Sequence, residues 1–123
     1  MKTRIFLFTT DRDVCETVAK IAQKSKWEGA ATNSVREGIG FLREYEWDIA
    51  IVDIGHRGSG FAMLDKLETA PDEIPSIVLT EPDAAYYQAL AFANGASEVL
   101  TTPLYAEQVR GAVTRLSQHG FRA

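Results

Sequence analysis

Five polar side chains stand at the ends of apolar runs in this 123-residue chain, and their types limit the chemistry that they can perform. They are one carboxylate, Asp53, and the hydroxyls of Thr9, Thr10, Thr80 and Thr102. Oxygen atoms of this kind are the ligands that a hard cation such as Mg²⁺ prefers. Hydroxyls at the start of a helix can also help to hold a phosphate. Either chemistry requires these residues to lie together, so the elements between them decide which is available.

Apolar runs typical of buried strands alternate with stretches of helical periodicity. Five strands and five helices in strict alternation predict an α/β fold, an open parallel sheet with helices on both faces. Ligands of such sheets bind beyond the carboxyl ends of the strands, where the five polar residues fall. The predicted strands are Ile5–Phe8, Trp27–Thr32, Asp48–Ile54, Ile74–Thr80 and Val99–Leu100. Two predicted helices start at the N-caps Asp11 and Ser34, and the others cover Phe61–Glu68, Asp83–Asn94 and Tyr105–Leu116.

The composition indicates one globular domain, with 46% apolar and 24% charged residues. We assign it residues 1–123, with 118–123 as a tail or the start of a linker. Cys15 is the only cysteine, which excludes an intrachain disulfide and favours a reducing, cytoplasmic location. The net charge of −4 argues against binding nucleic acid or an anionic membrane. No apolar run is long enough for a membrane span or a signal peptide.

Four segments together carry a resemblance to a known family. They are Asp48–Ile54, Pro75–Thr80, Asn94–Ser97 and Thr102–Pro103, and their order and spacing are as specific as their residues. In these segments the chain resembles the CheY-like receiver domain of bacterial response regulators. The resemblance implies a flavodoxin-like (βα)5 fold with strand order 2-1-3-4-5, which places the ends of strands one and three side by side. It also implies a cis peptide bond between Thr102 and Pro103.

The resemblance further implies roles for the five polar residues. Asp53 matches the phosphoacceptor aspartate, and Thr80 matches the hydroxyl that contacts the phosphoryl group. The acidic pair that joins the aspartate in holding Mg²⁺ is replaced by Thr9 and Thr10, and the lysine after strand five is replaced by Thr102. Val99 occupies the aromatic switch position, three residues before that lysine.

These replacements predict an atypical receiver. Three carboxylates and one lysine sum to −3 + 1 = −2, whereas one carboxylate among threonines gives −1, so no buried charge is left without a partner. Neutral hydroxyls compensate a +2 ion poorly, and phosphoryl transfer depends on neutralising the oxygens of the transferred group. We therefore expect no cofactor, with weak Mg²⁺ binding at Asp53 at most. We expect no enzyme activity, and a phosphorylation-independent interaction module in two-component signalling, a pseudo-receiver.

Several alternatives stay open at this stage. The chain is a conventional response regulator if Asp53 accepts phosphate despite a degraded metal site. It is a flavodoxin-type binder of flavin mononucleotide if the hydroxyls around Thr9 and Thr10 hold the phosphate. The plain interpretation is that Asp53 caps its loop while Thr9, Thr10 and Asp11 form a strand exit and a helix cap. His56 and Arg57, which follow Asp53, either supply the missing positive charge or lie in a solvated loop.

The fourth predicted helix points to a protein partner. From Ala84 to Ala93 it holds one polar residue, Gln88, whereas a helix outside a sheet needs only one apolar stripe. Matching its end to the family places Ala91 and Phe92 inward. The resemblance implies that the face formed by helix four, strand five and helix five is the output and dimer surface, so we expect this face to bind a protein, most simply a second copy of the chain. The expected interface residues are Tyr86, Tyr87, Leu90, Ala93 and Tyr105.

Overall fold

The computed structural model describes residues 2–55 and 58–119 of the chain, and it contains the predicted strands and helices. The strands are β1 (Arg4–Phe8), β2 (Glu28–Thr32), β3 (Ile49–Asp53), β4 (Ser76–Thr80) and β5 (Glu98–Thr101). The helices are α1 (Arg12–Ser25), α2 (Val35–Glu44), α3 (Gly60–Glu68), α4 (Ala85–Ala93) and α5 (Ala106–His119).

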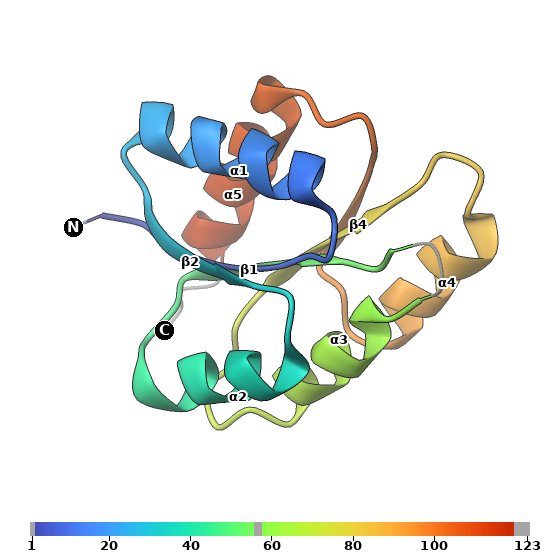
Figure 1. Cartoon of the computed structure of the whole chain (residues 1–123), viewed down its shortest axis with the longest axis horizontal. Coiled ribbons are helices and arrows are strands. Elements are labelled where there is room, and N and C mark those ends of the chain that lie inside the picture. The colour runs from blue at the N-terminus through green and yellow to red at the C-terminus, as the bar shows by residue number, and fades with distance from the viewer. Residues whose placement is uncertain (1, 56–57, 120–123) are drawn as a thin grey trace.

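All the strand pairs are parallel, in the order β2-β1-β3-β4-β5, so the predicted flavodoxin-like fold is confirmed. Helices α1 and α5 cover one face of the sheet, and α2, α3 and α4 cover the other (Figure 1). None of these helices, within 2–55 and 58–119, combines the length and the apolar character needed to cross a membrane. Because all the strand pairs are parallel, the carboxyl ends of the strands lie at the same edge of the sheet, where the polar residues meet.

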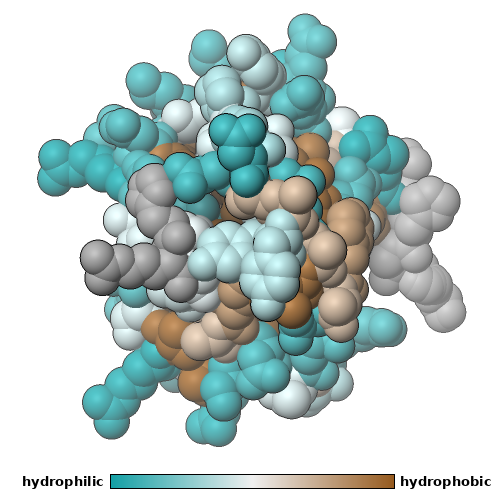
Figure 2. Space-filling view, turned by 90° about the vertical axis from the view of Figure 1, so that its right-hand side faces the viewer, coloured by the Kyte–Doolittle hydropathy of each residue, from teal (hydrophilic) through white to brown (hydrophobic). Residues whose placement is uncertain are grey.

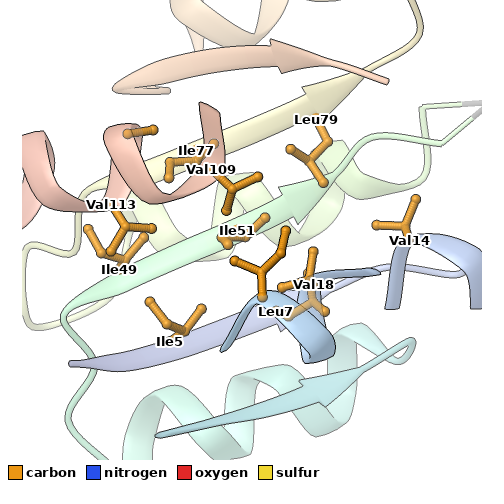
Figure 3. Close-up of a cluster of buried hydrophobic side chains, with 12 residues drawn as sticks. Ile5, Leu7, Val14, Val18, Ile49, Ile51, Ile77, Leu79, Val109 and Val113 are labelled. Carbon is orange, nitrogen blue, oxygen red and sulfur yellow. The ribbon is translucent and has the colours of Figure 1, made fainter. Parts of the chain in front are cut away.

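The core has one layer on each side of the sheet because neighbouring residues of a strand point to opposite faces. The first core cluster lies under α1 and α5 (Figure 3) and contains Ile5, Leu7, Val14, Val18, Ile21, Ile49, Ile51, Ile77, Leu79, Val109, Ala112 and Val113. The second core cluster lies under α2, α3 and α4 and contains Phe6, Phe8, Leu42, Ala50, Val52, Ile54, Met63, Leu64, Leu67, Val78, Ala91 and Ala96. Strand β3, between β1 and β4, is buried along its whole length, so it holds Asp53 rigidly.

The helix starts follow from local hydrogen bonds. The Asp11 carboxylate accepts from the Asp13 and Val14 amides, and the Ser34 hydroxyl accepts from the Glu37 amide, so both predicted N-caps are confirmed. Helix α4 starts two residues later than predicted. A turn closed by the Ala84 amide on the Glu81 carbonyl, at 3.2 Å, occupies the residues assigned to its first turn.

Candidate functional site

Asp53 and Thr9 form the centre of the candidate site, at the carboxyl ends of two neighbouring strands. The pairing of Phe8 with Val52 brings the residues that follow them side by side. The Thr9 hydroxyl donates to Asp53 Oδ2 at 2.6 Å, and the Gly55 amide donates to Asp53 Oδ1 at 3.2 Å. Both oxygens of this carboxylate, which is only 9% exposed, are therefore bound by neutral donors of the chain itself.

Thr9 also organises the start of α1. Its hydroxyl oxygen accepts from the Asp11 amide at 3.0 Å, and Asp11 in turn caps the helix. Thr9 is 5% exposed, whereas its neighbour Thr10 is exposed. The two threonines predicted to replace an acidic pair thus differ in position, because one contacts Asp53 and the other faces solvent.

Thr80 and Thr102 meet beside Asp53 on the far side of β3. The Thr102 amide donates to the Thr80 carbonyl at 2.9 Å, and the peptide bond from Thr102 to Pro103 is cis, as predicted. The Thr80 hydroxyl is buried and has no hydrogen-bond partner in the part of the chain that the structure describes. Val99 is half-buried against the second core cluster.

A cavity of about 300 Å³ opens at this edge and brings Thr10, Asp53, Thr80 and Thr102 together. Its walls also include Asp11, which was predicted only as a helix cap, and three polar residues that the sequence analysis did not single out, namely Asp13, Thr17 and Glu81. Glu81 directly follows Thr80, and Asp13 lies in the first turn of α1. Their positions in the sequence could therefore have indicated that they lie near the candidate site. The described residues that line the cavity include no lysine or arginine.

The residues around Asp53 offer a magnesium ion few suitable ligands. Mg²⁺ requires near-octahedral oxygen ligands and usually one or two free carboxylates. The Asp53 oxygens already accept hydrogen bonds, and residues 2–55 and 58–119 contain no group of three His, Cys, Asp or Glu side chains placed to hold a metal. His56 and Arg57, considered as substitutes for the missing positive charge, lie outside the described residues.

The predicted interface residues are only partly accessible. Tyr86 is 73% exposed and Tyr105 is 61% exposed, and Ala93 is also exposed. Tyr87 and Leu90 are half-buried, and Tyr87 packs edge-on against Phe61 with ring centroids 5.5 Å apart. Figure 2 shows this end of the molecule, where pale and hydrophobic residues gather between hydrophilic ones.

The predicted inward position of Phe92 is wrong, because its side chain is 55% exposed. Ala91 is fully buried and is the only residue of α4 that is. Successive residues of a helix point about 100° apart, so Phe92 does not share the buried side of α4 on which Ala91 lies. The accessible surface of α4 therefore includes the large aromatic side chain of Phe92.

Comparisons with known proteins agree with this architecture. The heme response regulator HssR of Staphylococcus saprophyticus is 28% identical over 108 residues, which cover 87% of this chain and 48% of that protein. The virulence transcriptional regulatory protein PhoP of Salmonella choleraesuis is 28% identical over 95 residues, 76% of this chain and 42% of that protein. The receiver domain of the Francisella response regulator 1452 superposes with a TM-score of 0.85, at 14% identity, over 98% of this chain and 100% of that domain.

The chain fits a response-regulator receiver domain. No protein-family model matches it. The chain spans less than half the length of these two curated relatives. Receiver domains are signalling modules of two-component systems, and they act through contacts with other proteins. In this fold, Asp53 stands at the carboxyl end of β3, and the Thr9 hydroxyl donates a hydrogen bond to it.

Proposed function

We propose that this receiver domain signals by binding a protein and does so without phosphate on Asp53. The observation that carries the proposal is the hydrogen bond from the Thr9 hydroxyl to Asp53 Oδ2, at 2.6 Å. It engages one of the two carboxylate oxygens through which Asp53 would have to react with a phosphodonor or bind a metal ion. A hydrogen bond to a carboxylate is short and strong, so it also holds the site in one arrangement.

Electrostatics around Asp53 support the same function. Transfer of a phosphoryl group requires cations to neutralise its oxygens, and the described lining of the cavity offers none. Asp11, Asp13 and Glu81 line the same cavity and add negative charge. An incoming phosphodonor, which is itself an anion, would meet carboxylates without the metal that usually screens them.

The flavin alternative finds less support. A flavin phosphate held at the start of α1 would need hydroxyl and amide donors free to face it. The Thr9 hydroxyl already donates a hydrogen bond to Asp53, and the amides of Asp13 and Val14 donate theirs to the Asp11 carboxylate. A purified protein with a bound flavin would be yellow, which provides a direct check.

Incubation with a small-molecule phosphodonor and Mg²⁺, followed by intact mass measurement, tests the central proposal. We expect no stoichiometric phosphoryl adduct on the wild-type chain. The matched control carries Thr9→Asp, Thr10→Asp and Thr102→Lys, which restore the charges of a typical receiver site, and it should gain an adduct that Asp53→Asn removes. Stoichiometric modification of wild-type Asp53 would contradict the proposal.

The partner surface that we propose is the face of α4, β5 and α5, with a second copy of the chain as its simplest occupant. Helix α4 has no charged residue from Ala85 to Ala93. Its exposed aromatic side chains are Tyr86 and Phe92, and Tyr105 adds a third just before α5. Aromatic residues with few charges are typical of the centre of a protein interface.

Substitutions on α4 test this surface through the oligomeric state. Phe92→Glu is the informative change, because Phe92 is exposed and its replacement leaves the core intact. Ala19→Glu adds the same charge at an exposed position of α1, on the other face of the sheet, and serves as the control. We expect association in sedimentation experiments that Phe92→Glu weakens and Ala19→Glu does not. A wild-type chain that stays monomeric at high concentration would contradict self-association.

A further inference from the structure

The outer edge of β2 has no strand beside it in residues 2–55 and 58–119. The Glu28 amide donates to the Thr3 carbonyl, and the Thr32 carbonyl accepts from the Thr9 amide, so the backbones of Glu28 and Thr32 face β1. Backbone groups of a strand alternate in direction. The N–H and C=O groups of Gly29 and Ala31 therefore point away from the sheet and are available to another strand.

This edge carries little of the protection that is usual for a free strand, since Glu28 is its one charged residue. Proteins block such edges with lysine, proline or a bulge, whereas β2 reads Glu-Gly-Ala-Ala-Thr with a regular register. Gly29 is small for a local reason, because a Cβ atom there would lie 2.8 Å from the Ile5 carbonyl oxygen. The small side chains leave open space beside β2 on both faces of the sheet.

The first space, the α1-side groove, has a volume of about 380 Å³. Gly29 and Ala31 pair with Ile5 and Leu7, so they share the face of the first core cluster. The groove is lined mainly by apolar side chains, and Trp27 forms part of its wall. Apolar side chains of an added strand would fill this groove.

The second space, the α2-side groove, has a volume of about 230 Å³ and is lined by three aromatic residues, by Arg4 and Glu28, and by the small residues of β2. The Arg4 guanidinium lies 5.9 Å from the Tyr45 ring centroid and 5.4 Å from that of Trp47. Among the residues that the structure describes, its buried Nε atom has no hydrogen-bond partner and its guanidinium forms no ion pair. Even Glu28, its neighbour in register, is exposed and makes none.

We infer that the β2 edge binds an extended segment of a partner protein, which adds to the sheet as a sixth strand. Alternate backbone groups of the segment pair with Gly29 and Ala31, the general mode of strand addition. Apolar side chains on one face of the segment enter the α1-side groove. A carboxylate on the other face pairs with Arg4, which supplies the charge complementarity. This site is separate from Asp53 and from α4.

A second copy of the chain fits this edge less well. Two β2 strands paired antiparallel about Ala30 would place Glu28 of one copy beside Thr32 of the other, at the end of the strand away from Arg4. Gly29 and Ala31 would also leave the α1-side groove unfilled. The foreign segment supplies both the carboxylate and the larger side chains.

The test uses the whole chain and the peptide acetyl-Thr-Ile-Glu-Ile-Thr-Ile-Thr-amide, followed by amide NMR. We expect saturable shifts and slowed hydrogen exchange at Gly29 and Ala31. Replacing the glutamate of the peptide by glutamine should weaken binding roughly tenfold on wild type, the scale of one charge-assisted hydrogen bond. The same replacement should have no effect on Arg4→Gln.

Backbone methylation separates strand addition from nonspecific adsorption. One peptide carries N-methyl groups on its three isoleucine amides, and another carries them on the glutamate and the following threonine. Strand addition requires one of these two to bind and the other to fail. Equal binding, failure of both, or absence of binding by the parent peptide would overturn the proposal. Shifts at Gly29 and Ala31 that depend on protein concentration without peptide would assign the edge to a second copy instead.

Discussion

The hydrogen bond between Thr9 and Asp53 can be tested by its contribution to folding stability. Thr9→Val keeps the shape of the side chain and removes the hydroxyl, so the buried Asp53 carboxylate keeps, among the described residues, only the Gly55 amide as a donor. A hydrogen bond to a charged group contributes about 1.5–3 kcal/mol, and the neutral bond from the Asp11 amide adds about 0.5–1.5 kcal/mol. We expect Thr9→Val to lower the free energy of unfolding by at least the contribution of the bond to Asp53, about 1.5–3 kcal/mol.

A double-mutant cycle isolates the pair from the contact with Asp11. Thr9→Val and Asp53→Ala are made singly and together, and urea unfolding is followed by circular dichroism at neutral pH. The coupling energy should be about 1.5–3 kcal/mol because the two side chains touch. Thr10→Val, at an exposed position, is the control and should change stability by less than about 0.5 kcal/mol. A coupling energy below about 0.5 kcal/mol would refute the view that this bond holds the site.

Three further predictions concern positions outside that pair. Thr80→Val should be neutral or stabilising in the same urea assay, because the buried hydroxyl that it removes has no partner among the described residues; a clear loss of stability would reveal one. Gly60→Ala should cost about 1–3 kcal/mol, since its Cβ would lie 2.8 Å from the Ile54 Cα, whereas Gly40→Ala, with open space around it, should gain about 0.5–1 kcal/mol. The hydrogen bonds and charge of Glu98 raise the pKa of Arg115. Their contribution to folding stability is therefore complete at neutral pH and is lost only as pH rises through that raised pKa. The stability difference between wild type and Arg115→Gln should therefore be flat across neutral pH, and a slope there would contradict this reasoning.

The sequence was sufficient to predict the strands, the helices and the parallel sheet because their signals are local, whereas the strand order was predicted from the resemblance to receiver domains. Buried runs such as Ile49–Asp53 and caps such as Asp11 and Ser34 are visible in the sequence alone. The placement of Asp53 at a strand end followed in the same way, because adjacent parallel strands end at the same edge.

What the sequence could not show depends on side-chain geometry. Thr9 fitted a strand exit as well as a partner of Asp53, and only the register of β1 against β3 brings its hydroxyl to the carboxylate. The position of Phe92 was missed for a different reason. Helix α4 has apolar residues all round, so its sequence pattern carries no information on which side is buried. A single buried residue, Ala91, shows which side faces the sheet.

The two tryptophans give each layer of the core its own fluorescent reporter. Trp27 packs against the first core cluster and Trp47 against the second, where its indole N–H donates to the Phe41 carbonyl at 2.9 Å. Single-tryptophan variants would therefore follow each side of the sheet separately during unfolding. Coincident transitions would show that the sheet couples both layers into one cooperative unit, whereas separate transitions would show a domain that can loosen one side at a time. Trp27 also borders the β2 edge, so the same variants would report whether an added strand tightens one layer or both.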